Sequence, residues 1–375
     1  MTIQVDDSRI KSVESRPYQV RRAMQQATRG RFTLLRLTLA LSIITYLDRV
    51  AISSAALVIR GDLQLTAVQI GWVFSAFTFA YAAFEIPSGW LGDVIGPRKV
   101  LARIVLWWSA FTMATGLAWN FASLVVARFL FGVGEAGAFP NISRSFAQWF
   151  PTRERGWAHG VVMMGTRLGG ALAPPIVAWL MGVAGWRQSF FVFDAIGVIW
   201  CVFWLKWYRD DPAKHPAVNR EELGLIQQGV DHSDAHRFRW SELLSWNLLF
   251  ICLMYFTMGY TLYFNLTWLP TYLKEVRGFS NQQAANLAGV VLTTGAIMTA
   301  FGGWLTDRLV KTYGLKIGRS VGAITLPVAA VLLIPPASTN NPVTAAILLA
   351  ATLGVADIGV SSCWSMCHDR GGSRA

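Results

Sequence analysis

Ten long apolar stretches constrain this chain more than any other feature of its sequence. A helix needs roughly 20 mainly apolar residues to cross the hydrocarbon core of a membrane. Strands are not expected, because no alternation of apolar and polar residues recurs, and a continuous helix satisfies its own backbone hydrogen bonds in lipid. The sequence therefore predicts an all-α, multi-pass membrane protein. The stretches cover residues 34–59, 68–91, 99–118, 121–143, 157–182, 188–208, 246–272, 284–306, 319–337 and 342–364.

The distribution of basic residues predicts the orientation of these helices. The chain is 54% hydrophobic and only 14% charged, against about 25% charged residues in a typical soluble domain. Most of its 33 Lys and Arg residues fall on the side that carries the N-terminus. That side is predicted to be cytoplasmic, because cytoplasmic loops hold an excess of Lys and Arg. The net charge of +12 thus needs no nucleic-acid partner. The opposite loops hold only Arg60, Arg187, Lys274 and Arg277.

An internal repeat divides the chain into two parts. "GWLGDVIGPRK" (89–99) follows the second apolar stretch, and "GWLTDRLVKTYGLKIGR" (303–319) follows the eighth. Parallel repeats of this kind occur in transporters. We predict a cytoplasmic tail at 1–32, a six-helix bundle at 33–208, a cytoplasmic linker at 209–245 and a four-helix bundle at 246–375.

Charged residues interrupt the apolar stretches, although an ionised side chain at mid-membrane costs at least about 2.5–3.5 kcal/mol. "ITYLDRVAIS" (43–52) carries Asp48 and Arg49 side by side. Arg128 and Glu135 are seven residues apart, so they share one helix face but lie about 10.5 Å apart along the axis. They are too distant to pair, and Asp48 and Arg49 are the predicted partners. The four groups form either a structural ion-pair network or a site that holds an anion and carries a proton.

The remaining intramembrane features carry weaker expectations. Glu85 is interpreted as a gating residue, whereas Arg167, Asp194 and Asp357 are expected near helix ends or reaching toward them. Tyr and Trp residues usually serve membrane-interface belts and packing. Pro174 and Pro175 are expected to interrupt the fifth helix. Tyr46, Tyr81, Tyr263, Trp268, Ser361 and Trp364 are candidates for hydroxyl bonds or stacking to a polyol.

Several motifs resemble one transporter family. The first repeat is similar to the signature G-x-L-x-D-x-x-G-x-R-K of the major facilitator superfamily. "YLDR" (46–49), "RFLFGVGEAGAFPN" (128–141), "LGGALAPPIV" (168–177) and "LTWLPTYL" (266–273) resemble its anion:cation symporter family. That family includes bacterial galactonate, glucarate and hexuronate importers, sialin and the vesicular glutamate carriers. The resemblance covers about residues 33–369 and implies two pseudo-symmetric six-helix bundles.

The resemblance also implies roles for individual residues. It assigns substrate binding to Arg49 and Arg128, which would contact the substrate carboxylate, and to pocket positions at Tyr46, Tyr81, Ser361 and Trp364. Proton coupling is implied for Asp48 and Glu135. A cytoplasmic gate is implied for Gly89, Asp93, Gly96, Arg98 and Asp307.

The resulting expectation is a proton-coupled importer of an organic anion in the inner membrane of a bacterium. The substrate would be a sugar acid such as a hexonate, hexarate or hexuronate. The expected partners are a small carboxylate, protons and membrane lipid, with no nucleic acid, cofactor or metal, and the protein is predicted to be a monomer.

Other functions follow from the same pattern. An organic-anion exchanger or exporter of this fold remains an alternative. A membrane enzyme is disfavoured because no HExxH or nucleophile-elbow motif occurs, and an ATP-driven pump because no GxxxxGK[ST] occurs. The family has twelve helices and ten are found here, so a truncated or frameshifted product is also expected. Such a chain would insert in the membrane yet be unstable and inactive.

Overall fold

The computed structural model describes residues 27–227, 246–360 and 362–363. Within those residues the secondary structure is helical, with no strand. Helices cover each of the ten predicted stretches in the described part of the chain. Seven helical segments there are long and apolar enough to cross a membrane.

The first helical group comprises the helices before the linker. Three pairs of helices pack along one another in it: α2 with α7, α3 with α5, and α4 with α8. Two of these helices have a capping box at the N-terminus. Thr66 and Gln69 form it in α3, and Asn120 and Ser123 form it in α5. The bounds are α2 Gly30–Asp62, α3 Ala67–Ile95, α4 Pro97–Gly116, α5 Phe121–Glu135, α6 Ala138–Trp149, α7 Thr152–Ala184 and α8 Trp186–Trp207.

The linker returns to the start of this group. It contains a short turn of 3-10 helix (Pro212–Lys214) and α9 (Arg220–Gln227). Glu222 of α9 is fully buried and accepts hydrogen bonds from the backbone amides of Gly30 and Arg31. These are free amides at the N-terminus of α2, where a carboxylate also interacts favourably with the helix dipole. The linker helix therefore caps the first membrane helix.

The second helical group follows the linker. In it α11 packs along α15, and α13 also contacts α15. Ser280 and Gln283 form the capping box that begins α11. The bounds are α10 Trp246–Glu275, α11 Asn281–Tyr313, α12 Leu315–Arg319, α13 Val321–Leu332, α14 Ile334–Ser338 and α15 Pro342–Ile358.

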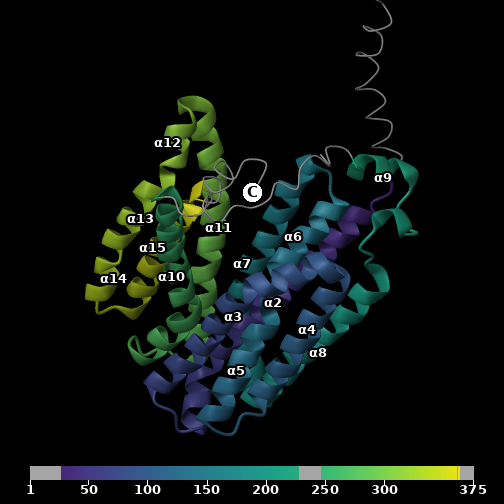
Figure 1. The fold of residues 1–375 in the computed structure, drawn as a ribbon. Coiled ribbons are helices and arrows are strands. Elements are labelled where there is room, and N and C mark those ends of the chain that lie inside the picture. The colour runs from purple at the N-terminus through teal and green to yellow at the C-terminus, as the bar shows by residue number, and fades with distance from the viewer. Residues whose placement is uncertain (1–26, 228–245, 361, 364–375) are drawn as a thin grey trace, which may run out of the picture.

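The two groups meet along α7 with α11 and α2 with α10. A Cβ on Gly289 would lie 2.9 Å from the backbone oxygen of Ala171, so only glycine allows α11 to approach α7 this closely. Val50, Leu266, Leu269 and other buried apolar residues form a core that joins the groups. Figure 1 shows the groups converging at one end and diverging toward the end where α6, α9 and α12 lie.

The structure divides two of the apolar stretches into shorter helices, and it contradicts one expectation about helix continuity. The stretch 121–143 is broken, because α5 ends at Glu135 and Gly137 adopts a left-handed conformation (φ 84°) that favours glycine before α6 begins. The stretch 319–337 lies within one segment, Leu315–Ser338, that is long and apolar enough to cross a membrane, and α12, α13 and α14 make up that segment. The predicted interruption at Pro174 and Pro175 is absent, since α7 continues through both residues.

Candidate functional site

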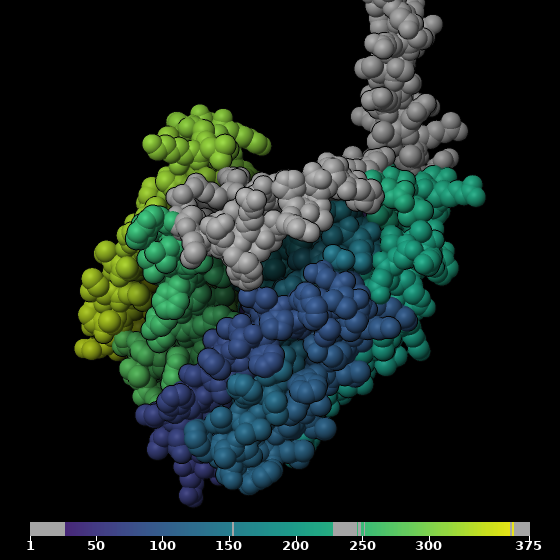
Figure 2. All heavy atoms as spheres, in the orientation of Figure 1, coloured from purple at the N-terminus to yellow at the C-terminus, as the bar shows by residue number. Residues whose placement is uncertain are grey.

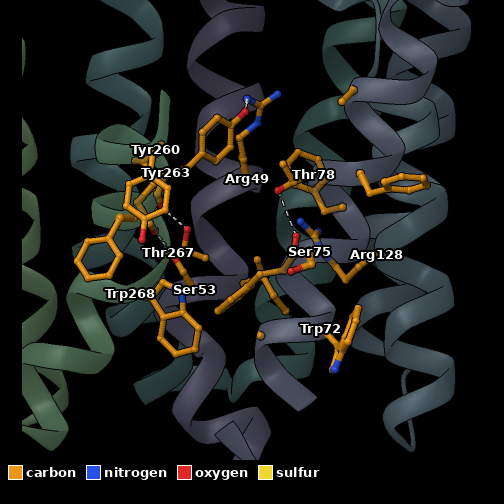
Figure 3. Close-up of a pocket in the computed structure, with 18 of the residues that line it drawn as sticks. Arg49, Ser53, Trp72, Ser75, Thr78, Arg128, Tyr260, Tyr263, Thr267 and Trp268 are labelled. Carbon is orange, nitrogen blue, oxygen red and sulfur yellow. Dashed lines mark hydrogen bonds between the residues drawn. The ribbon is translucent and has the colours of Figure 1, made fainter. Parts of the chain in front are cut away.

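A cavity of about 980 Å³ lies where α2, α3, α5 and α10 come together. Figure 3 shows α10 residues, among them Tyr263 and Trp268, on one side of it and α3 residues such as Trp72 and Thr78 on the other. Apolar side chains make up most of the wall, and the polar groups are few, as is usual for a small-molecule site. Its polar and aromatic lining includes Arg49, Ser53, Trp72, Ser75, Thr78, Arg128, Tyr260, Tyr263, Thr267 and Trp268.

Arg49 of α2 is fully engaged by its neighbours. Its Nε and Nη2 donate to Oε1 of Glu135 at 3.1 and 2.7 Å, and its Nη1 donates to the hydroxyl of Tyr263 at 3.0 Å. The rings of Tyr46 and Tyr81 lie 4.9 and 4.7 Å from its guanidinium carbon. Cation–π contacts of this kind stabilise a desolvated cation. The predicted pairing of Arg49 with Glu135 is therefore present in the structure.

Arg128 of α5 is placed differently. It is 1% exposed and lines the cavity, yet its Nε and Nη1 have no hydrogen-bond partner among the described residues. Its guanidinium carbon lies 4.1 Å from the centre of the Phe131 ring. Unsatisfied donors of a buried cation are costly, so this side chain is suited to receive an anion.

Asp48 does not pair with Arg128 as the sequence predicts. The carboxylate is 2% exposed, and neither of its oxygens has a hydrogen-bond partner within the described residues. Glu135 and Arg128 both lie close enough to Asp48 to act on it electrostatically, although neither forms a hydrogen bond with it. Asp48, Arg49, Arg128 and Glu135 together hold two positive and two negative charges when all are ionised.

The predicted gating residues lie at one end of α3 and α11. Asp93 pairs with Arg144 of α6 at 3.0 Å rather than with Arg98, whose Nη2 donates to the Leu205 carbonyl. A Cβ on Gly89 would lie 3.2 Å from Pro140. Gly96 has a positive φ (84°) between α3 and α4, and Asp307 is exposed on α11. The structure thus ties Asp93 to α6 within the first group.

Arg167 lies in the middle of α7, so its expected position near a helix end is wrong, whereas Asp357 lies one residue before the end of α15, as expected. Arg167 and Asp357 form an ion pair at 3.4 Å between α7 and α15, so they join the two helical groups. Asp357 is 5% exposed. Asp194 is partly exposed on α8, and Glu85 accepts a hydrogen bond of 3.4 Å from Tyr81.

Several lining residues have no counterpart among the residues that the sequence selected. These additional lining residues are Ser75, Thr78, Tyr260 and Thr267. Tyr263 and Trp268, which the sequence does single out as candidates, also line the cavity. On α3 the three-residue spacing of Ser75 and Thr78 marks one helix face, whereas the lining residues of α10 carry no such signal because apolar positions occur on every side of that helix. Ser361 and Trp364 lie outside the described residues. Within the described residues, no group of three His, Cys, Asp or Glu side chains is arranged to hold a metal ion.

A comparison with protein families identifies the family to which this helical protein belongs. Residues 38–374 match the family model of the Major Facilitator Superfamily. The chain belongs to this superfamily. Its members are transporters and not enzymes, which accords with a cavity between two helical groups. The chain is therefore a multi-pass membrane protein of the transporter class.

Similar proteins narrow the class further. The chain is 38% identical over 359 residues to the probable sulfoacetate transporter SauU of Cupriavidus necator, covering 94% of this chain and 83% of that protein. It is 33% identical to the hexuronate transporter of Bacillus subtilis, covering 82% and 73%. A bacterial homologue of the human lysosomal transporter Spinster, solved inward-facing and unoccupied, has the same fold (TM-score 0.69, 19% identity, covering 90% and 74%). The relatives are transporters of small organic anions.

Proposed function

We propose that this protein imports a small organic anion together with protons across the bacterial inner membrane, with its N-terminus in the cytoplasm. One observation carries the proposal: Arg49 is occupied by Glu135, whereas two donor atoms of Arg128, in the same cavity, have no hydrogen-bond partner among the described residues. A guanidinium binds a carboxylate or sulfonate through paired hydrogen bonds, so Arg128 supplies the first contact to the anion.

The charge balance of the site supports proton coupling. Asp48, Arg49, Arg128 and Glu135 are each less than 10% exposed and sum to zero charge when ionised. Adding an anion leaves a net negative charge in a medium of low dielectric constant, which is unfavourable. Protonation of Glu135 removes that charge and at the same time releases Arg49 for the anion. Burial favours the neutral carboxyl group and Arg49 favours the ionised one, so the anion itself shifts the balance toward protonation.

The lining favours an anion that also carries hydroxyl groups. Ser75, Thr78, Tyr263 and Thr267 bring hydroxyls to the cavity, which suits the polyol chain of a sugar acid. The hexuronate transporter at 33% identity supports this class. A second candidate is a short sulfonate such as sulfoacetate, because the sulfoacetate transporter is 38% identical over most of this chain.

The test measures equilibrium binding of galacturonate and of sulfoacetate by the purified chain at a series of pH values. If one proton binds with the anion, affinity falls by up to about tenfold per unit rise in pH. Glu135→Gln removes the proton site, so its affinity should not depend on pH. Glu85→Gln is the matched control, since Glu85 is another carboxylate within the helices but makes no ion pair with Arg49 in the structure.

Two outcomes would overturn the proposal. Affinity that is independent of pH in the unaltered protein would favour exchange of one anion for another. Equal competition by an uncharged hexose would remove the protein from the organic-anion class. Preference between galacturonate and sulfoacetate decides between the two candidates.

A further inference from the structure

The outer surface of α4 has an apolar part and a cationic end. Its exposed side chains recur every three or four residues, and its buried ones lie on the opposite face. Such a large apolar surface on a multi-pass protein faces the acyl chains of lipid. In Figure 2, α3 and α4 form part of the visible face. From the N-terminal end of α4 onward, the stripe consists of Lys99, Arg103, Leu106, Trp107, Ala110, Met113 and Leu117.

Lys99, Arg103 and Trp107 form a row on this stripe, four residues apart. The 20 residues of α4 measure about 30 Å, close to the thickness of the hydrocarbon core. Arg103 lies about 9 Å along the axis from Pro97. With Pro97 placed at the edge of the hydrocarbon core, Arg103 lies inside the core and Lys99 lies nearer the headgroups.

The guanidinium of Arg103 is held at this depth. Its Nη2 donates to Oγ of Ser88 on α3 at 3.1 Å. Ser88 is 6% exposed, and its backbone carbonyl accepts from Nδ2 of Asn141 on α6. A free arginine near a helix end reaches toward the headgroups, but this one is directed across the α3–α4 groove.

Neither cation of the row has a protein counter-ion in the described part of the chain. No described carboxylate lies within 4.0 Å of a nitrogen of Lys99 or Arg103. The two acids at this end of the α3–α4 hairpin are engaged elsewhere: Asp93 pairs with Arg144, and Asp210 accepts from the Arg98 amide. The described residues therefore leave both charges open to an anion from outside the protein.

We infer that Lys99 and Arg103 bind the phosphate of an anionic phospholipid, with Trp107 packing beside its acyl chains. Arginine forms paired hydrogen bonds with phosphate, and lysine adds a second charge nearer the headgroups. Trp107 lies about 15 Å along the axis from Pro97, at the depth of the acyl chains. Basic groups between membrane helices on the cytoplasmic side are suited to anionic lipid headgroups. The site lies on the outer surface of α4, apart from the transport cavity.

The test places the full chain in nanodiscs of phosphatidylcholine with increasing phosphatidylglycerol and counts retained lipids by native mass spectrometry. We expect phosphatidylglycerol to be retained in preference to phosphatidylcholine. Arg103→Gln should weaken that retention by about tenfold, as expected for loss of charge-assisted hydrogen bonds. Ser88→Ala, which keeps the charge but removes its anchor, should weaken it less.

Arg36→Gln is the matched control. Arg36 is also exposed six residues after its helix begins, but it donates to Phe32 O and Thr33 Oγ1 of its own helix. If Arg36→Gln and Arg103→Gln lose the same amount of phosphatidylglycerol retention, the retention reflects general attraction to positive charge and the proposed site is wrong. Equal retention of both lipids would overturn it without any variant. Displacement of the lipid by millimolar inorganic phosphate would identify a site for free phosphate instead.

Discussion

The ion pair between Arg167 and Asp357 gives a prediction about what holds the two helical groups together. Arg167 belongs to α7 and Asp357 to α15, and α11 packs against both of these helices. A Cβ on Gly295 of α11 would collide with the Asp357 carboxylate, so α11 lies directly against the pair. The perturbation is Asp357→Asn, which leaves the arginine without its counter-charge.

The magnitude follows from burial and geometry. Removing one partner of a well-buried ion pair costs about 3–5 kcal/mol, because the remaining charge is uncompensated. Here the side chains are 18% and 7% exposed and the distance is 3.4 Å, so partial solvation reduces the effect. We expect about 2–3 kcal/mol of lost unfolding free energy for Asp357→Asn. Arg167→Gln should cost a similar amount.

The assay is a double-mutant cycle on unfolding free energy in mixed micelles. The double variant Arg167→Gln/Asp357→Asn contains no uncompensated charge, so it should be more stable than the sum of the two single losses predicts. The exposed pair of Arg187 with Asp62 is the control, and Arg187→Gln should cost less than about 1 kcal/mol. Strictly additive losses, or single variants as stable as the unaltered protein, would refute the reasoning.

Three further predictions concern the site, the linker and the helix seam. Arg128→Lys keeps the charge but loses the paired hydrogen bonds, so equilibrium binding should weaken about tenfold or more. Unchanged affinity would argue against contact with the anion. Glu222→Gln weakens the cap on α2 and should cost about 1–3 kcal/mol in unfolding free energy, so a stable variant would contradict that role. Gly169→Val pushes against the backbone of Ile43 and should cost about 1–3 kcal/mol. Gly182→Val, with open space around it, should be nearly neutral, and equal costs would disprove the packing argument.

The helices and the charged centre of the site follow from local signals in the sequence. Long apolar stretches predict membrane helices because lipid leaves few alternatives for the backbone. Arg49 and Arg128 stand out because a charge in such a stretch needs a purpose or a partner. The spacing of Arg128 and Glu135 excludes a pair between them and predicts a partner for Glu135 on another helix, which in the structure is Arg49.

The remaining contacts depend on packing between distant segments. Arg167 and Asp357 are 190 residues apart, and nothing in either local sequence indicates the other. The break at Gly137 requires a backbone conformation that glycine permits but does not impose. Charge alone predicts a pair between Asp48 and Arg128, whereas the packing of side chains between α2 and α5 decides whether the contact forms. The α10 lining was hidden for the same reason, since apolar positions on every side of a membrane helix give no facing direction.

The most direct measurement counts the protons that the protein takes up when an anion binds. The purified chain is mixed with galacturonate or sulfoacetate in weakly buffered micelles containing a pH indicator. The account predicts uptake of about one proton with the singly charged galacturonate, because the four charged groups of the site already balance. Glu135→Gln should bind the anion without this uptake. Saturable binding with no proton uptake by the unaltered protein would contradict proton-coupled transport through this site.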